Sequence, residues 1–240
     1  MAQRKIPLVE GEFFHIYNRG NSKQKIFLDN HDRDRFVKLL YLCNSKKAFN
    51  FRDDIVRTGT DAWDFDREGT IVAIGAWVLM PNHFHIYIVI PRLDQVKAKK
   101  SQISFFMEKL GKAYAHYFNT KYKRTGSLFE GKFKSVHVNN DPQAKYIFSY
   151  IHLNPIKLID KGWKENGIKD FKDAKKFLES YKWSSYLDYK KTIRPENKIL
   201  NKEIFPNYVK NIKDLDTEIQ EWLKFREDEP ALSGTRQDFL

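Results

Sequence analysis

Short stretches of the chain have the apolar pattern of β-strands. Residues 13–18, Phe-Phe-His-Ile-Tyr-Asn, are aromatic and β-branched and end in the loop formers Arg19-Gly20-Asn21. Residues 71–79 are almost continuously apolar, and residues 83–90 follow them after the turn Met80-Pro81-Asn82. These two stretches predict a β-hairpin.

Apolar residues at spacings of three and four predict helices between the strands. The first helix begins at Asp29 or Asn30, either of which can cap it, and runs to about residue 44. A third helix starts at Asp141-Pro142 and ends near Pro155, because proline disfavours helical geometry at the residue before it. The apolar stripes are Phe36, Leu39, Leu40 and Cys43 in the first helix and Ile103, Phe106, Leu110, Ala113 and Tyr117 in the second.

With a further strand over residues 133–138, the order is strand, helix, strand, strand, helix, strand, helix. This order predicts an α+β fold, a ferredoxin-like antiparallel sheet with helices on one face and the other face free for a site. We expect a catalytic domain over residues 1–190, with an insertion at about residues 45–70. Residues 191–240 are expected to form a helical C-terminal appendage.

The charge of the chain indicates a class of binding partner. The chain of 240 residues has a formal net charge of +12 and a pI near 9.5. Residues 92–134 hold eleven lysines and arginines against three acids, a net +8. Such a concentration favours a polyanion such as nucleic acid, although charge alone also fits a solvated surface.

Several classes of protein are disfavoured. The longest apolar run is about half of the roughly 18 residues that a membrane helix needs, and the N-terminus has no apolar core of a secretory signal. We therefore expect a cytoplasmic protein without a membrane partner. The single cysteine, Cys43, lies in an apolar helical pattern and is more consistent with a core thiol than with a nucleophile.

The predicted strand after Pro81-Asn82 carries the most distinctive chemistry. Alternation sends His83, His85 and Tyr87 to one face, with the imidazoles about 7 Å apart along the strand. Two such histidines can chelate one cation and leave coordination positions open, so that a phosphate oxygen could be polarised there. A third ligand is still needed.

The third helix offers Tyr146, Tyr150 and Asn154 on one face. A nucleophile and an amide ligand could project together from this face. A phenol ionises near pH 10, so it attacks poorly until a cation or base activates it. Without the histidine pair, Tyr150 would be interpreted as an ordinary packed aromatic residue.

These residues resemble a known family. The runs at residues 80–85 (Met-Pro-Asn-His-Phe-His), 124–133 and 150–155 (Tyr-Ile-His-Leu-Asn-Pro) look like those of the single-tyrosine HUH transposases. The likeness is greatest to the REP-associated tyrosine transposases, which process repetitive extragenic palindromes. Residues 14–20 and 183–186 fit the same pattern, so the resemblance covers roughly residues 13–189.

The resemblance implies a ferredoxin-like endonuclease acting on single-stranded or hairpin DNA of palindromic repeats. His83 and His85 would hold Mg²⁺ or Mn²⁺, with Asn154 completing the metal shell. Tyr150 would form a 5′-phosphotyrosine link and free a 3′-hydroxyl. Such an enzyme would work as a monomer or a homodimer.

Candidate DNA contacts flank the last predicted strand. Arg124, Lys132 and Lys134 carry charge suited to phosphates. Arg19 and Asn21 are weaker candidates, since a plain loop is as good an interpretation. Two alternatives to a transposase stay open: a non-catalytic binder of structured nucleic acid, and a replication or plasmid-transfer nickase with the same chemistry.

Overall fold

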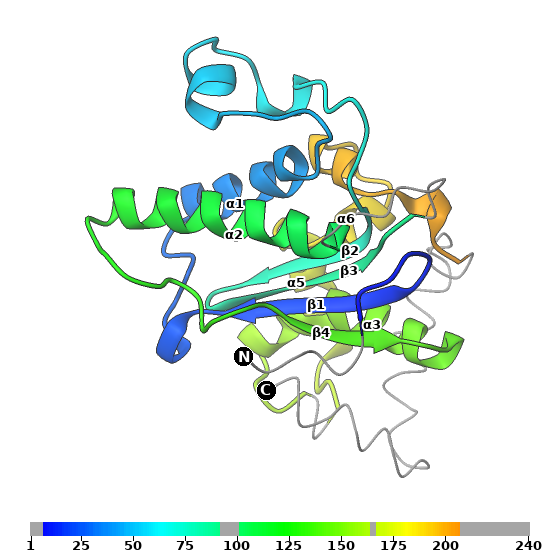
Figure 1. Cartoon of the computed structure of the whole chain (residues 1–240). Helices are drawn as coiled ribbons and strands as arrows, with labels where there is room; N and C mark the ends of the chain where they lie inside the picture. The colour runs from blue at the N-terminus through cyan, green and yellow to red at the C-terminus, as the bar shows by residue number, and fades with distance from the viewer. Residues whose placement is uncertain (1–6, 92–100, 164–166, 207–240) are drawn as a thin grey trace.

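A four-stranded antiparallel sheet forms the centre of the computed structural model, which describes residues 7–91, 101–163 and 167–206 (Figure 1). The strand order is β2-β3-β1-β4, which is the ferredoxin-like order for this sequence of elements. The predicted hairpin is confirmed, because β2 pairs with β3 across the Pro81-Asn82 turn. The strands are β1 (Phe13–Arg19), β2 (Ala73–Met80), β3 (His83–Val89) and β4 (Lys134–Val138).

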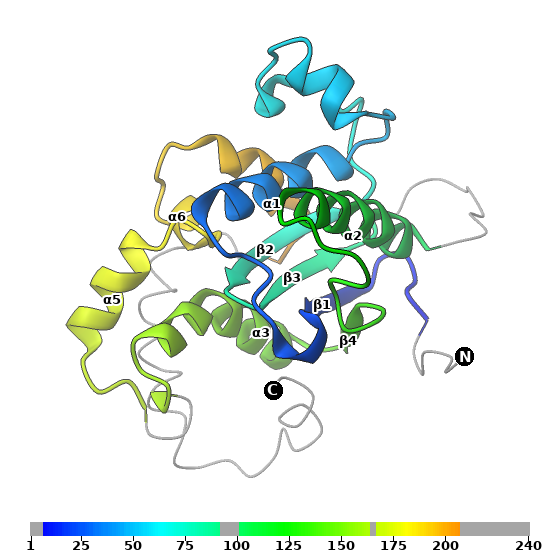
Figure 2. The same ribbon diagram turned by 90° about the vertical axis from the view of Figure 1, so that its left-hand side faces the viewer.

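Helices α1 (Asn30–Cys43) and α2 (Gln102–Lys121) cover one face of the sheet, as predicted (Figure 2). Asp29 caps α1 in a capping box with Asp32. The side chains of Phe14, Ile16 and the even-numbered residues of β3 point into this layer. Cys43 is buried there, and burial raises the pKa of its thiol to about 12, which agrees with a core thiol.

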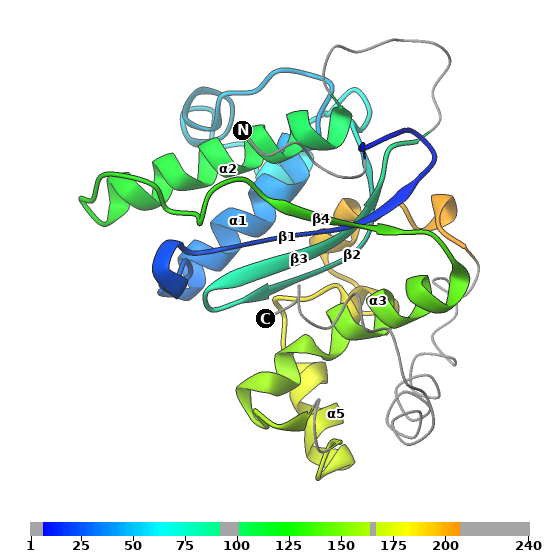
Figure 3. The same cartoon turned by 60° about the horizontal axis from the view of Figure 1, so that its bottom comes forward.

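The opposite face is not open, and this part of the prediction is wrong. Helix α3 (Asp141–Leu153) packs on β2 and β3 from the other side, and α5 (Phe171–Ser180) lies below the sheet with it (Figure 3). The short helix α6 (Tyr186–Tyr189) adds its two tyrosines to the same apolar cluster. The physical reason is that most of this sheet face is apolar and requires a cover. Its central apolar residues are Ala73, Ala76, Val78, Val89 and Val138, which meet Ile147 and Ile151 of α3.

The ends of α3 differ slightly from the prediction. Asn140, not Asp141, caps the helix by accepting a hydrogen bond from the Gln143 amide, and Pro142 sits in the first turn. After Leu153 the chain tightens into the 3-10 helix η4 (Asn154–Leu158), which contains Pro155. The face that α3 turns to the sheet therefore continues directly into Asn154.

The segment at residues 45–70 lies on the side of α1 and α2 that faces away from the sheet, at the top of Figure 1, and holds η2 (Phe51–Val56, a π-helix) and η3 (Ala62–Asp64). It packs through aromatic contacts, with the Arg35 guanidinium 3.6 Å above the Phe51 ring and the Tyr41 and Trp63 rings 5.3 Å apart. The chain then leads from this segment back to the sheet at β2. The buried side chain of Asn44 fixes this connection by hydrogen bonds to the backbone of residues 71 and 72. The short turn η1 (Asn21–Lys23) follows β1.

The chain after residue 180 completes the edge of the sheet beside β2. The amide of Leu79 donates to the Trp183 carbonyl and the amide of Ser185 donates to the Trp77 carbonyl, each at 2.9 Å. The turns η5 (Pro195–Ile199) and η6 (Lys202–Ile204) follow, and the Phe205 ring packs tightly over Gly75, where a Cβ would lie only 2.6 Å from it. Residues 207–240, most of the predicted appendage, lie outside the described residues, and the domain boundary near residue 190 stays a prediction.

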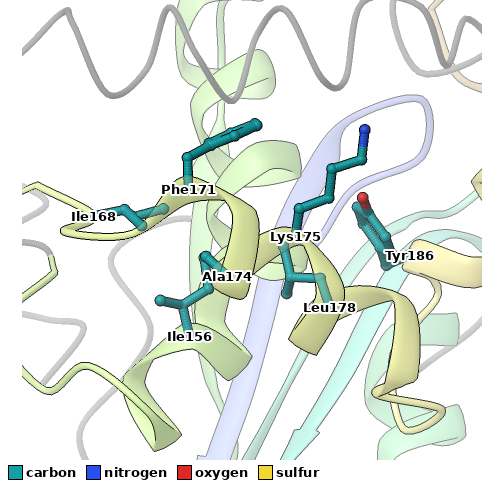
Figure 4. Close-up of a pocket in the computed structure, with 7 residues that line it drawn as sticks. All are labelled: Ile156, Ile168, Phe171, Ala174, Lys175, Leu178 and Tyr186. Carbon is teal, nitrogen blue, oxygen red and sulfur yellow. The ribbon is translucent and has the colours of Figure 1, made fainter.

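A small pocket lies between α5 and η4 (Figure 4). Phe171, Ala174 and Leu178 of α5 and Ile156 of η4 give it a mainly apolar lining. It lies beneath α5, and neither of the predicted metal-binding histidines lines it. In the described part of the chain, no helix is long and apolar enough to cross a membrane.

One buried carboxylate joins the two helices of the first layer. Asp32 of α1 accepts hydrogen bonds from the Leu28 amide, the Tyr122 hydroxyl and the Lys121 ammonium, the last at 2.7 Å. Burial alone would raise the pKa of Asp32, but these donors outweigh it and hold the pKa below its ordinary value of 3.8. The ionised form therefore stabilises the packing of α1 on α2.

We expect Asp32→Asn to lower the free energy of unfolding at pH 7 by about 1.5–3 kcal/mol, because an amide cannot accept all of these bonds. Since folding lowers the pKa, this contribution is present above pH 3.8 and is lost as the pH falls through the lowered value. Urea unfolding at pH 7 and pH 3 measures the difference in the free energy of unfolding between the variant and the wild type. Asp29→Asn is the matched control: asparagine caps a helix as well as aspartate does, and the ion pair with Lys121 that it loses is partly exposed and contributes little. Equal stability of Asp32→Asn and the wild type at pH 7 would contradict the assignment.

Candidate active site

The register of β1 on β3 gathers polar side chains on the face that α3 covers. Residues directly opposite one another in antiparallel strands point to the same face. Both histidines of β3 therefore share this face with alternate residues of β1. The opposed pairs are Arg19 with His83, Tyr17 with His85, and His15 with Tyr87.

The histidine pair has the arrangement predicted from the sequence, with the ring centroids of His83 and His85 5.0 Å apart. Each ring also contacts a polar neighbour through Nδ1. The His83 Nδ1 lies 2.6 Å from the Asn82 Oδ1, and the His85 Nδ1 lies 2.9 Å from the Nε2 of His15. His85 is only 2% exposed and His15 is fully buried.

His15 and Tyr17 are site residues that the sequence reasoning missed. The Tyr17 ring lies 5.7 Å from the His85 ring and 5.2 Å from the His15 ring. A signal was available, because alternation in Phe-His-Ile-Tyr sends these two residues to the same face of β1. What the sequence could not show is which neighbouring strand this face would meet in register.

Helix α3 brings Tyr150 and Asn154 to the same histidines. The Tyr150 ring stands edge-on to His85 at 5.4 Å between centroids, and edge-on to His15 at 6.1 Å. Tyr146, one turn earlier, stacks on Tyr150 at 6.1 Å. The Asn154 side chain hydrogen-bonds to the Tyr150 hydroxyl. The structure thus joins His83, His85, Tyr150 and Asn154 in one cluster.

The environment of Tyr150 keeps its phenol neutral. Tyr150 is 1% exposed, and burial raises its pKa well above the ordinary value of 10.0, with a smaller contribution of the same sign from Tyr146. The hydrogen bond from Asn154 acts in the opposite direction but does not offset burial. A nucleophilic role for Tyr150 requires a positive charge nearby, since only that stabilises the phenolate in so dry a position.

The donor atoms at this site fit a divalent cation. The Asn154 Oδ1 is buried and accepts no hydrogen bond within the described residues, so an oxygen donor is available beside the histidine pair. Imidazole nitrogens with an amide oxygen form a mixed donor set that suits Mn²⁺ and, with added water, Mg²⁺. Among described residues, no cluster of three or more His, Cys, Asp or Glu side chains could hold a metal.

The predicted DNA-contacting residues are distributed unevenly around the cluster. Lys134 is exposed and lies opposite Tyr17 in the register of β4, in the same cross-strand row as His85. Lys132 is exposed just before β4. The Arg19 guanidinium forms an ion pair with Glu130, so its charge is partly neutralised.

The other two candidates lie apart from this row. Asn21 is exposed at the start of η1. Arg124 follows the C-terminal end of α2, where its guanidinium lies 5.6 Å from the Phe118 ring centroid. Phe129 packs against the α1–α2 core, with its ring 6.1 Å from that of Phe84.

No protein-family model matches the chain, and no curated protein matches it in sequence. Among solved structures, the chain is similar to a REP-associated tyrosine transposase bound to a REP hairpin, with 12% sequence identity and a TM-score of 0.49. The match covers 82% of this chain and 90% of the other.

The raised pKa of Tyr150 has a direct spectroscopic consequence. We expect the native wild type and Tyr150→Phe to show the same increase in phenolate absorbance between pH 8 and pH 11, because burial keeps this phenol protonated there. In urea the wild type should gain one phenolate more than the variant. A smaller absorbance gain in the native variant than in the native wild type would show that Tyr150 ionises normally.

Proposed function

We propose that the chain is a metal-dependent DNA endonuclease and strand transferase that uses Tyr150 as its nucleophile, in the manner of the single-tyrosine HUH transposases. The observation that carries this proposal is the contact of Tyr150 with His85, with Asn154 bonded to the same phenol. A packed core tyrosine needs neither two histidines nor an unsatisfied amide oxygen beside it. This combination supports chemistry at the hydroxyl.

The residues that would hold the cation are His83 and His85 through ring nitrogens and Asn154 through Oδ1. A bound Mg²⁺ or Mn²⁺ would supply Lewis-acid polarisation of a phosphate oxygen and positive charge beside the phenol. Burial raises the pKa of Tyr150 and so disfavours the phenolate. The positive charge of a cation would stabilise the phenolate, and the polarised phosphate would be easier to attack.

In the proposed reaction, the Tyr150 oxygen attacks the phosphorus of a DNA phosphodiester. The bond from phosphorus to the 3′ oxygen breaks, a 5′-phosphotyrosine forms, and the phenolic proton is transferred overall to the departing 3′ oxygen. A second 3′-hydroxyl can then attack the phosphotyrosine and regenerate the phenol, which joins two strands. The phosphodiester energy is kept in the covalent link, so strand transfer needs no nucleotide cofactor.

The proposed substrate is single-stranded or hairpin DNA. A phenol that is 1% exposed between α3 and the sheet meets a phosphate only after the groups around it move apart. An unpaired strand is thinner and more flexible than a regular duplex and needs the smaller opening. Lys134, exposed in the row of Tyr17 and His85, can contact a phosphate next to the one attacked. Lys132, just before β4, adds a second exposed positive charge next to Lys134 in the sequence.

The burial of Tyr150 also favours a second candidate function, a binder of structured nucleic acid that performs no chemistry. In that case the histidines and Asn154 would be a packed polar cluster, and the basic edge at β4 would carry the function. The formation of a covalent adduct separates the two functions.

We expect the full chain, mixed with a labelled single-stranded hairpin substrate and Mn²⁺, to form a covalent adduct that persists in a denaturing gel. Tyr150→Phe should bind the DNA normally and form no adduct, because it removes only the hydroxyl. Tyr146→Phe is the matched control and should keep the adduct. EDTA, His83→Ala and His85→Ala should each abolish it, if the proteins remain folded by circular dichroism.

Mass spectrometry of the cross-linked peptide identifies the nucleophile. A phosphopeptide at Tyr146, or an adduct that survives in Tyr150→Phe, would overturn the assignment of Tyr150. The absence of any adduct with a range of hairpin and unpaired substrates would instead favour the non-catalytic binder.

We expect the affinity for a hairpin with an unpaired flank to fall steeply with salt. Each phosphate neutralised on a single strand contributes about 0.7 to the slope of log affinity against log salt. Lys134→Gln should therefore reduce the slope by roughly 0.7, whereas Lys172→Gln on the exposed face of α5 should leave it unchanged. Fluorescence anisotropy between 50 and 200 mM salt measures the slopes, and identical slopes for both variants would exclude Lys134 from the interface.

A further inference from the structure

Both histidines of the candidate metal site engage a polar neighbour through the same ring nitrogen. The Nδ1 of His83 lies 2.6 Å from the Asn82 Oδ1, and the Nδ1 of His85 lies 2.9 Å from the His15 Nε2. In each ring, Nε2 is therefore the atom that can coordinate a cation. A neutral imidazole offers a lone pair on Nε2 only when its proton is on Nδ1.

The contact with Asn82 determines where the proton of His83 lies. The Nδ2 of Asn82 donates to the Lys23 carbonyl at 3.2 Å, which turns Oδ1 toward His83. An amide oxygen can only accept a hydrogen bond, so Nδ1 of His83 carries the proton. The Nε2 of this ring is then ready to bind a metal.

The contact between His85 and His15 has two possible arrangements. If the Nδ1 of His85 donates, its Nε2 has a lone pair and can bind a cation. If the Nε2 of His15 donates instead, the proton of neutral His85 lies on Nε2, and metal binding is blocked. The preference of the His15 ring for accepting or donating therefore decides whether His85 is a competent ligand.

The position of His15 suits an orienting role. It is fully buried, stacks on Tyr17 at 5.2 Å and meets Tyr150 edge-on at 6.1 Å. These contacts hold the ring plane, so its Nε2 stays directed at His85. Residues that hydrogen-bond to metal-binding histidines commonly fix the tautomer and the ring orientation in this way.

We propose that His15 is a positioning residue that accepts a hydrogen bond from Nδ1 of His85 and so fixes the Nε2 lone pair for the metal, as Asn82 does for His83. This inference rests on the proposed function, because it assumes that the histidine pair binds a divalent cation. His15 itself touches neither the metal nor the DNA in this role. Its contribution lies in the tautomer and orientation of its neighbour.

The first test measures Mn²⁺ affinity of the full chain by the electron paramagnetic resonance signal of free Mn²⁺. We expect His15→Phe, which keeps a ring but removes the acceptor, to weaken binding by roughly 10–100-fold. His15→Gln places an amide oxygen near the original Nε2 and should restore most of the affinity. His137→Phe in β4, at a histidine that pairs with Glu12 instead, is the control and should bind Mn²⁺ like the wild type.

The second test needs no metal, and its decisive measurement uses the wild type. Long-range nitrogen-proton NMR of the metal-free wild type should show His85 with its proton on Nδ1. In His15→Phe the proton should shift toward Nε2, the form that an imidazole prefers in water, and His15→Gln should keep it on Nδ1. A wild-type His85 protonated on Nε2 overturns the inference, even if His15→Phe does not fold.

The outcomes separate this inference from the function on which it rests. Wild-type protein that binds no Mn²⁺ would overturn the metal site and the inference together. Mn²⁺ binding that is lost in His85→Ala but unchanged in His15→Phe would overturn only the role of His15. Loss of affinity in both His15→Phe and His15→Gln, with an unchanged His85 tautomer, would assign His15 to packing and also overturn the proposal.

Discussion

β1 and β3 lie side by side at the centre of the sheet, and the register between them decides which side chains reach each face. In this register Phe14 and Ile16 enter the layer of α1 and α2, while His15 and Tyr17 join His85 beneath α3. A slip by one residue would exchange the two sets, because side chains alternate along a strand. It would bury polar rings in an apolar core and remove the neighbour of His85. The fold and the candidate site therefore depend on one set of backbone hydrogen bonds.

The second layer explains why the candidate site is dry. The sheet face opposite α1 and α2 is mostly apolar, so α3 must cover it. The cluster of histidines, Tyr150 and Asn154 lies beside this apolar contact. Its rings hydrogen-bond or stack on one another, which limits the cost of removing them from water. The same burial raises the pKa of Tyr150. Low exposure keeps the phenol neutral and unreactive without a cation, and it would also strengthen the effect of any cation bound beside it.

Much of the fold could be predicted from the sequence because it depends on local patterns. The four strands, the hairpin after Pro81-Asn82 and the helices at α1, α2 and α3 were each predicted to within a few residues, since alternation, capping and proline act over short distances. The spacing of His83 and His85 and of Tyr150 and Asn154 likewise places each pair on one face of its own element. These local facts indicated a possible metal site and a tyrosine beside an amide, and the family resemblance implied the role of nucleophile for Tyr150 and of metal ligand for Asn154.

What only the tertiary structure decided is how separate elements meet. Sequence alone determined that a polar histidine strand and a tyrosine helix exist, but the prediction of an open sheet face was wrong, because no local pattern states which side of a sheet a helix covers. The pairing of Arg19 with Glu130, the contact of His15 with His85 and the burial of Tyr150 all join residues that are far apart in the chain. Such contacts follow from strand register and layer packing, and these are set by the burial of the whole apolar surface rather than by the residues of any one segment.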